Sequence, residues 1–390
     1  MIPFKNLLLV LLTTLLFCCQ TDSVKHTVQC YDNRADSSNS HPKAAALTYL
    51  MTTYVKKGLP GMAMLVHDNN GTWVSSAGKA DIGKSINFEP CHVSKAASIT
   101  KLFLGTLTMK LVEEGALQLD EKISKWIPGK YLNKIKNAKE TTLRQLLNHS
   151  SGIYDVIKDD GFYLAVLNNP NKNWTPDELL EFVYNKDAVF PCGSQFKYSN
   201  TNTLLVSMVI EYATGRKHSQ LLHEKILTPL GLRNTFYHYH DPLPSTTAQG
   251  YFDLYNNGSI VNVSNYITGS GNGYGGLHSN VFDLYTFLDA LLVKKTILQP
   301  ATLIEMTTMS GYDENRGYGQ GCLEDFGEKG PGNTGIGHTG RDLGYSCDLF
   351  YFKKNNTILC FLINYGTDGN SNLKNVFKEF ESSLVDVVLQ

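Results

Sequence analysis

The sequence lacks the charge pattern, the metal-ligand spacing and the internal repeats that mark several common protein classes. Its charge is nearly balanced, with 35 basic and 36 acidic residues in 390 and no dominant basic patch. Nucleic-acid binding depends on clustered Lys and Arg, so this composition argues against a nucleic-acid partner. No Cys-x-x-Cys pair and no His-rich cluster is present, which gives no indication of a zinc site.

Long apolar runs are also missing. Lys5 precedes an apolar run over residues 7–17, which is shorter than the roughly 20 residues that a membrane-spanning helix needs. This pattern predicts a secretory signal at residues 1–19, followed by a polar tether at residues 20–43. The segment Leu16-Phe17-Cys18-Cys19 resembles a relaxed bacterial lipobox, so a lipid anchor on Cys19 and simple cleavage of the signal are both left open. We therefore expect an extracytoplasmic protein: a periplasmic or cell-surface lipoprotein, or a secreted protein.

The composition of the rest of the chain favours a folded body with a sizeable core, because 42% of all residues are hydrophobic. Six cysteines follow the signal at scattered positions, which allows disulfides in an oxidising compartment without indicating their pairing.

Strand patterns lie near both ends of this body, and helical patterns lie between them. Residues 61–81 predict one β-hairpin and residues 349–364 predict a second, while residues 44–57 and 372–389 predict flanking helices. The middle is mostly helical, with a capping box at Thr175 to Glu178. We expect one antiparallel sheet domain from residues 44–119 and 271–390, with residues 120–270 inserted as a helical domain.

Ser98 and Lys101 are the candidate nucleophile pair. The pattern Ser-x-x-Lys occurs five times, and its serine stands at positions 40, 76, 98, 194 and 371. At Ser98 the apolar period changes to about 3.6, which predicts a buried helix that begins there. A spacing of three on a helix places the lysine within reach of the hydroxyl, which is a poor nucleophile until a base takes its proton. The helix N-terminus also favours an oxyanion that develops nearby.

Two further motifs follow in chain order. Tyr198-Ser199-Asn200 lies in a polar loop just ahead of an apolar helix, where a hydroxyl and an amide can both face a cleft. His338-Thr339-Gly340 precedes a strand-rich segment, and a glycine on an edge strand lets a substrate backbone approach closely.

Together these motifs resemble the serine β-lactamase and penicillin-binding superfamily, in the branch of class C β-lactamases, D-alanyl-D-alanine carboxypeptidases and related esterases. The resemblance covers about residues 45–385 and includes four side motifs: Gly115-Ala-Leu-Gln-Leu-Asp120, Leu146-Leu-Asn-His-Ser-Ser-Gly152, Thr228-Pro-Leu-Gly-Leu232 and Gly273-Tyr-Gly-Gly-Leu-His-Ser279. It implies a β-lactamase/transpeptidase-like fold of the α/β plus α class, in which helices flank an antiparallel sheet. It also implies a serine hydrolase that works without a metal or cofactor, and we expect a monomer.

The roles of the site residues are carried over from this resemblance. Ser98 attacks a carbonyl, Lys101 and Tyr198 share the proton, and which of the two is the base is left open. Asn200, His338, Thr339 and Gly340 are expected to bind substrate. The backbone N–H groups of Ser98 and Arg341 are expected to form the oxyanion hole.

Two departures from the family pattern bear on the substrate. Class C β-lactamases usually have Lys where this chain has His338, and a neutral imidazole cannot hold a carboxylate as a lysine does. We therefore expect a small peptide or ester as substrate, with β-lactam hydrolysis as the alternative. Arg341 is bulkier than the residue usually found there, which suggests that its guanidinium contacts a substrate carboxylate. A non-catalytic penicillin-recognition protein is the rival from another class, although the intact Ser98, Lys101 and Tyr198 set speaks against it.

Overall fold

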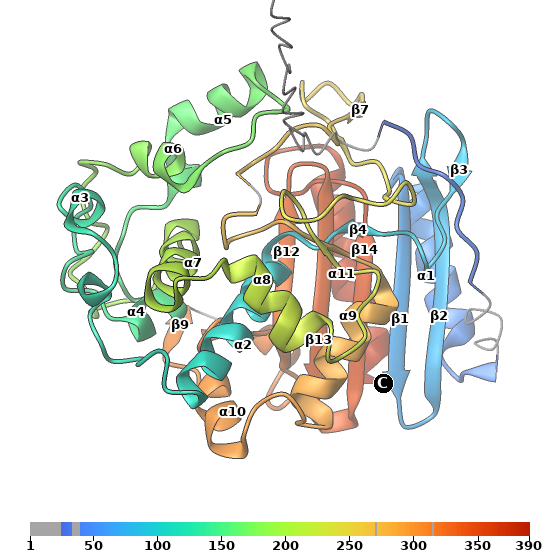
Figure 1. Cartoon of the computed structure of the whole chain (residues 1–390). Helices are drawn as coiled ribbons and strands as arrows, with labels where there is room; N and C mark the ends of the chain where they lie inside the picture. The colour runs from blue at the N-terminus through green and yellow to red at the C-terminus, as the bar shows by residue number, and fades with distance from the viewer. Residues whose placement is uncertain (1–24, 33–39, 270, 314–315) are drawn as a thin grey trace, which may run out of the picture.

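The structure is a computed structural model that describes residues 25–32, 40–269, 271–313 and 316–390 (Figure 1). The predicted signal at residues 1–19 lies outside the described residues, as does part of the predicted tether. Within the described chain, no helix is both long enough and apolar enough to cross a membrane.

A large antiparallel sheet forms the centre of the molecule. In the described residues its strands follow the order β3-β2-β1-β14-β13-β12-β11-β10-β9. They are β1 (Gly61–Asp68), β2 (Gly71–Asp81), β3 (Ile86–Asn87), β9 (Gly311–Asp313), β10 (Arg316–Tyr318), β11 (Leu323–Asp325), β12 (Gly335–Asp342), β13 (Tyr345–Phe352) and β14 (Thr357–Ile363). Both predicted hairpins are confirmed, and β1 pairs with β14, which joins the two ends of the chain in one sheet.

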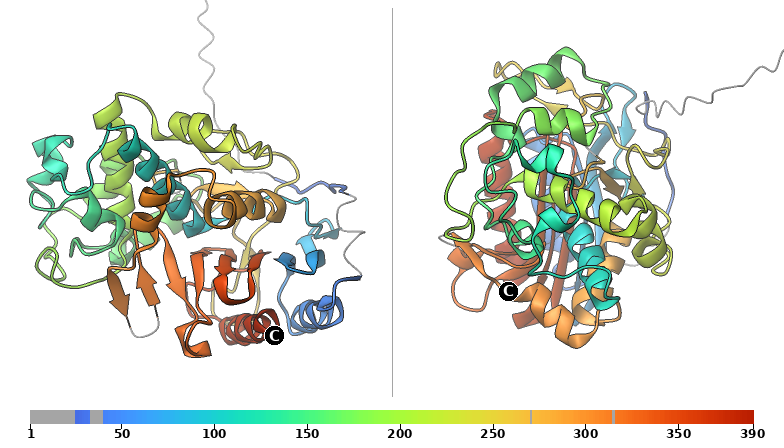
Figure 2. Two further views of the ribbon diagram at one scale, coloured as in Figure 1. Left: turned by 90° about the horizontal axis from the view of Figure 1, so that it is seen from below. Right: turned by 60° about the vertical axis from the view of Figure 1, so that its left-hand side comes forward.

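Helices cover both faces of the sheet, as Figure 2 shows. One face carries α1 (Ala44–Lys56) and α11 (Leu373–Leu389); the other carries α2 (Thr100–Glu113), α9 (Val281–Leu288) and α10 (Pro300–Thr307). Strand β1 shows the reason, because Met62 and Met64 pack in the core of the first face and Ala63 and Leu65 in the core of the second. Successive strand residues point to opposite faces, so an apolar strand needs a cover on each side.

The middle of the chain is mostly helical, and most of it lies beside the sheet, on the left of Figure 1, with α8 (His218–Leu222) in front of the sheet near the centre. Its other helices are α3 (Gly129–Leu132), α4 (Leu143–Leu147), α5 (Asp160–Asn168), α6 (Pro176–Glu181) and α7 (Asn200–Thr214). The predicted capping box is present at the start of α6, where Thr175 accepts from the backbone N–H of Glu178 and the Glu178 carboxylate accepts in return. Two small sheets complete the described fold: β4 (Ser94–Lys95) with β8 (Leu277–Ser279) and β5 (Phe236–Tyr237), and β6 (Tyr251–Phe252) with β7 (Val261–Asn262).

A disulfide joins Cys30 to Cys91 and ties residues 25–32 to the folded body. Thr27 reinforces this attachment, because its backbone N–H donates to Asp81 and its hydroxyl donates to the carbonyl of Thr247. The described part of the predicted tether therefore packs against the body.

Candidate active site

Ser98 lies at a tight turn between the small sheet and α2. A 3₁₀ turn at Ala97–Ile99 carries it, so Ser98 precedes the α-helix, which begins at Thr100, rather than starting it. Ala97 has a φ of 45°, a left-handed conformation that is strained for a residue with a side chain. The preceding residue is fixed by a hydrogen bond from the N–H of Ala96 to the carbonyl of Leu277. The surrounding structure therefore keeps the Ala97 backbone in this strained conformation, directly beside the candidate nucleophile.

Lys101 is completely buried and faces Ser98 across 3.0 Å between Nζ and Oγ. Its Nζ also donates to Oδ1 of Asn200 over 2.8 Å and to the carbonyl of Tyr274 over 2.6 Å. Burial lowers the lysine pKa to about 7, against the opposing effect of nearby carboxylates, of which Asp155 is the strongest. Near neutral pH a good part of this amine is therefore free of its extra proton and can act as a base.

The hydroxyl of Tyr198 also hydrogen-bonds to Ser98, and the tyrosine ring centroid lies 4.9 Å from Lys101 Nζ. Burial raises the pKa of Tyr198 far above its usual range, although the contact with Ser98 lowers it. The phenol thus keeps its proton and is suited to donate it. Of the two groups left open by the sequence, Lys101 has the pKa of a base and Tyr198 that of a proton donor.

Asn200 connects Lys101 to a buried carboxylate that sequence reasoning missed. Asp155 accepts from the backbone N–H of Asn200 over 2.9 Å and from its side-chain amide over 3.3 Å. The amide nitrogen must therefore face Asp155, which leaves Oδ1 for the lysine. The sequence predicted that Asn200 lies in a loop, but it is the first residue of α7. Nothing distinguished Asp155 in the sequence except its position three residues after the Leu146–Gly152 motif.

His338 lies on β12 and is buried at 1% exposure. Its Nδ1 contacts the carbonyl of Thr339 at 2.5 Å and its Nε2 lies 2.7 Å from the hydroxyl of Tyr318. Burial, helped by the charge of Lys101, lowers its pKa to about 3, so the imidazole is neutral. Nδ1 must then carry the hydrogen, and Nε2 accepts from Tyr318. Tyr318 was not identified from the sequence, where it is one of 21 tyrosines.

His149 explains why the Leu146–Gly152 motif accompanies the catalytic motifs. It is fully buried, and its ring lies 4.5 Å from that of Tyr198 and 4.6 Å from that of Tyr318. Nδ1 accepts from the amide of Asn202 over 3.0 Å and from the backbone N–H of Ser199 over 3.3 Å. Burial holds the pKa of His149 well below the usual value, so a neutral ring packs against Tyr198.

Strand β12 forms one wall of the site. Its partner β11 pairs only with Gly335–Gly337, so among the described strands none pairs with that edge of Thr339 and Gly340. A Cβ atom on Gly340 would collide with the carbonyl of Ala96 and with the sulfur of Cys347. Glycine here lets the turn that carries Ser98 rest directly on the strand.

The guanidinium of Arg341 does not lie with Ser98 and Lys101. It donates to Asp348 over 2.8 Å and to Glu381 of α11 over 2.5 Å, and it stacks on Phe377 at 4.6 Å. Two internal carboxylates already occupy this cation, so the geometry does not support the predicted contact with a substrate carboxylate. The predicted oxyanion role uses only its backbone N–H and is unaffected.

A cavity of about 340 Å³ connects these residues. Its lining includes Ser98, Tyr198, Asn200, His338, Thr339 and Arg341, together with Asp155, Tyr274, Tyr318 and Asp368. Lys158 also lies at its wall, as does Arg316, which forms an ion pair with Asp325. Among the described residues, no group of three or more His, Cys, Asp or Glu side chains is arranged to hold a metal ion.

The sheet, the helical layer and the Ser-Lys-Tyr constellation between them are those of serine hydrolases with a β-lactamase fold. The chain belongs to the Beta-lactamase family, whose model matches residues 44–378. Members of this family are generally serine hydrolases, including amidases and carboxypeptidases.

Solved structures share nearly the whole fold. The D-stereospecific amidohydrolase from Streptomyces sp. has 30% identity and a TM-score of 0.75, over 86% of this chain and 98% of that one. The D-amino acid amidase from Ochrobactrum anthropi SV3 in complex with L-phenylalanine amide has 25% identity and a TM-score of 0.77, over 88% and 98%.

Curated relatives match a shorter region. Protein flp of Staphylococcus aureus strain MW2 is 28% identical over 46% of this chain and 36% of its own length. The D-alanyl-D-alanine-carboxypeptidase/endopeptidase AmpH of Escherichia coli strain K12 is 28% identical over 46% of both chains. The chain thus matches less than half the length of these relatives.

Proposed function

We propose that the protein is an extracytoplasmic serine hydrolase that cleaves an amide or ester bond through an acyl-Ser98 intermediate, with D-alanyl peptides or short esters as its substrates. The observation that carries the proposal is the 3.0 Å approach of the buried Lys101 amine to the Ser98 hydroxyl, at the wall of a cavity of about 340 Å³.

The mechanism follows from the protonation states of the three groups. Neutral Lys101 takes the proton of Ser98 as Oγ bonds to the substrate carbonyl carbon, and the backbone N–H groups of Ser98 and Arg341 stabilise the oxyanion. Tyr198 delivers a proton to the leaving amine or alcohol and is reprotonated from Lys101. Water then attacks the acyl-enzyme, one of its protons returns to Ser98, and the acid product leaves.

A substrate derived from a D-amino acid is supported by the relatives. The names of AmpH and of the Streptomyces amidohydrolase both refer to D-configured substrates. Neutral His338 disfavours β-lactam hydrolysis as the main activity, because it lacks the positive charge that holds a β-lactam carboxylate. Lys158 at the cavity wall is the cation that we expect to take up the carboxylate of a peptide instead.

Location outside the cytoplasm is supported by the Cys30–Cys91 disulfide, since such bonds persist in oxidising compartments. A secretory signal, which ends either in a lipid on Cys19 or in simple cleavage, and a monomeric state belong to the same proposal. Mass spectrometry of the native mature N-terminus and light scattering of the purified protein test them.

The test of function is intact-mass analysis of the protein treated with a penicillin and with a serine-directed fluorophosphonate. Ser98→Ala serves as the control, which should form no adduct. A panel of D-Ala-D-Ala peptides, D-amino acid amides and short-chain esters then ranks the substrates. Adduct formation with turnover supports the enzyme, adduct without any turnover favours a penicillin-recognition protein, and no adduct from either reagent rejects the proposal.

A further inference from the structure

The carbonyl of Tyr274 is one of three acceptors around Lys101 and belongs to a glycine-rich loop. It lies 2.6 Å from Nζ, closer than either Ser98 or Asn200. Gly271 and Gly273 both have a φ of 88°, a left-handed conformation that favours glycine. A backbone of this kind needs anchors if its carbonyl is to stay aimed at the lysine.

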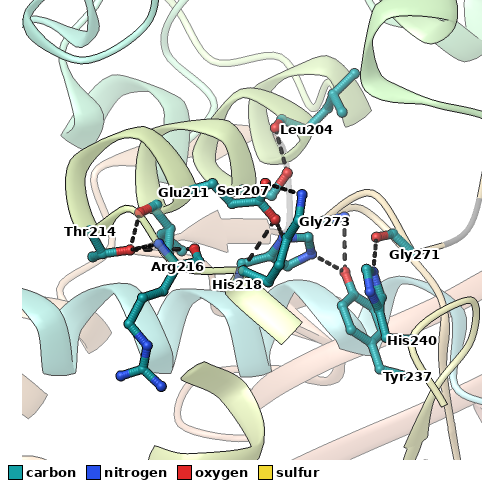
Figure 3. Close-up of polar contacts among 12 residues, drawn as sticks. Leu204, Ser207, Glu211, Thr214, Arg216, His218, Tyr237, His240, Gly271 and Gly273 are labelled. Carbon is teal, nitrogen blue, oxygen red and sulfur yellow. Dashed lines mark hydrogen bonds and ion pairs between the residues drawn. The ribbon is translucent and has the colours of Figure 1, made fainter. Parts of the chain in front are cut away.

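A hydrogen-bonded row of three side chains, Tyr237, His218 and Glu211, anchors the loop (Figure 3). The backbone N–H of Gly273 donates to the hydroxyl of Tyr237 over 3.0 Å, and this hydroxyl lies 3.0 Å from Nε2 of His218. The Nδ1 atom of His218 lies 2.8 Å from a carboxylate oxygen of Glu211 on α7. Tyr237 and His218 are 1% and 5% exposed, whereas the Glu211 side chain at the far end of the row is 28% exposed.

The donors and acceptors of this row define a direction. Gly273 occupies one acceptor position of Tyr237, so the phenol proton is free to point at Nε2 of His218. Nε2 then accepts, and Nδ1–H donates to Glu211. Burial opposes ionisation of Glu211, but hydrogen bonds from His218 and Lys217 lower its pKa to about 2, so the carboxylate is charged at any working pH. Every donor in the row points towards this charge.

We propose that Glu211, His218 and Tyr237 form a positioning relay that holds the Gly273–Tyr274 backbone so that its carbonyl fixes the amine of Lys101 beside Ser98. The three side chains touch neither substrate nor nucleophile. They act through the loop and set both the position of the amine and the ease with which it loses a proton. The inference rests on the proposed acylation of Ser98.

Other charged groups near both ends of the relay bear on any pH dependence. Those that face Lys101 are Asp155, Asp342 and Asp368, which favour its charged form, and the neutral rings of His149 and His338. Those that face the relay are Lys217 at Glu211, Asp241, which accepts from the backbone N–H of Tyr237 over 2.7 Å, and His240, whose ring lies 5.4 Å from that of His218 and 4.9 Å from that of Tyr237. The proposed variants change none of these groups.

Tyr237→Phe tests the relay, because it removes only the hydroxyl that Gly273 contacts. The rate of Ser98 labelling by a fluorophosphonate is measured by intact mass across the pH range. We expect a rate about 10- to 100-fold lower, since small misplacements of catalytic groups have effects of this size. The carbonyl dipole stabilises the charged amine, so its loss should also move the acid limb of the profile down by about half a pH unit to one unit.

Two further variants separate positioning from general damage. Glu211→Gln keeps the shape of the far end of the relay but removes its charge, and we expect a smaller shift of the limb in the same direction. Tyr251→Phe is the matched control: its buried hydroxyl also accepts a backbone N–H, from Ile82 over 2.8 Å, but it does not line the catalytic cavity. It should leave both rate and profile unchanged.

The outcomes distinguish this inference from the proposed function. If wild-type Ser98 is not labelled at all, the proposed function is wrong, and the inference that rests on it is rejected with it. If the wild type is labelled and the folded Tyr237→Phe and Glu211→Gln proteins keep its pH profile, the relay is structural only and the inference is overturned. Should Tyr237→Phe fail to fold, Glu211→Gln alone decides in the same way.

Discussion

The hydroxyl of Tyr318 lies 2.7 Å from Nε2 of His338, and both groups are buried in the wall of the candidate active site. This contact brings a residue of β10 to the third catalytic motif on β12. The tautomer of the neutral imidazole is determined by the Thr339 carbonyl, which can only accept and so requires the hydrogen on Nδ1; Nε2 then accepts from Tyr318. His338 is therefore held in one orientation beside Tyr198, whose ring lies 6.3 Å away.

Tyr318→Phe should weaken both stability and activity. A buried nitrogen left without its donor costs about 1–3 kcal/mol of unfolding free energy. We also expect a decrease in kcat/KM, since the freed ring can turn towards the site. Urea denaturation and ester hydrolysis measure the two effects, and an unchanged unfolding free energy would show that the contact contributes nothing.

The pH dependence of Ser98 acylation should report the lysine. The pKa of Lys101 is lowered to about 7, and the reactive form is the neutral amine, so the rate should rise with pH through a midpoint near pH 7 and level off about one unit above it. Lys101→Arg, which cannot lose its proton at these pH values, should be about 100- to 10,000-fold slower. A midpoint near the ordinary lysine value, or a flat profile, would contradict a lysine base.

Arg341→Ala should destabilise the protein rather than change its specificity. The substitution leaves Asp348, which is 0% exposed and whose pKa is raised by burial, without its hydrogen-bond donor, and a buried polar group that loses its partner costs about 1–3 kcal/mol of unfolding free energy. Turnover of carboxylate-bearing and neutral substrates should change equally in the folded fraction. If Arg341→Ala lost turnover of carboxylate-bearing substrates selectively, Arg341 would have a role in substrate binding after all.

Replacing Asp348 as well supplies the control for Arg341. In the Arg341→Met, Asp348→Leu double variant no buried charge is left unpaired between these two positions. We expect it to recover part of the stability lost in Arg341→Ala, as measured by urea denaturation. If the double variant is the less stable of the two, the ion pair itself stabilises the fold.

Gly340→Ala should remove activity while the protein stays folded. The added methyl group would collide with the carbonyl of Ala96, so the turn that carries Ser98 must move away from β12. A shift of about 1 Å can cost about 100-fold in rate. Fluorophosphonate labelling measures the loss, with circular dichroism to verify folding. Gly332→Ala is the control, since a Cβ there meets nothing within 4 Å, although its φ of 74° makes some strain expected.

Reduction of Cys30–Cys91 should lower thermal stability without abolishing acylation. The bond closes a separation of 61 residues, and disulfides typically stabilise by about 2–4 kcal/mol. Cys30→Ser should melt at a lower temperature than the oxidised wild type and show no further change with reductant. If reductant lowered the melting temperature of both proteins equally, the effect would not come from the Cys30–Cys91 bond.

Much of the fold could be predicted because its signals are local. The two hairpins and the closing helix at residues 373–389 follow from side-chain periods of 2 and 3.6, and the capping box at Thr175 follows from its own four residues. The fine structure at the nucleophile could not, because the 3₁₀ turn and the positive φ of Ala97 are imposed by packing against β12 and β8.

The candidate site divides in the same way. The order of Ser98, Tyr198 and His338 along the chain, with their neighbouring residues, was sufficient to single out the trio and the family. Asp155 and Tyr318 carried no comparable signal, since the role of each depends on residues that lie far away in sequence. His149 lay within the Leu146–Gly152 motif, but the motif did not indicate its contacts with Tyr198 and Tyr318. For Arg341 a signal existed: side chains alternate along a strand, so Arg341 faces away from His338 and Gly340.

The sequence by itself thus determined the family, the antiparallel sheet with its helical insertion, and which serine is the candidate nucleophile, because motifs and apolar periods are properties of neighbouring residues. Only the tertiary structure decided the chemistry of that serine. It buried Lys101 among Asn200, Tyr274 and Ser98, which lowers the lysine pKa to about 7, and it turned Arg341 towards Asp348 and Glu381. Burial and the direction of a side chain depend on what packs around it, and packing joins residues that the chain keeps apart.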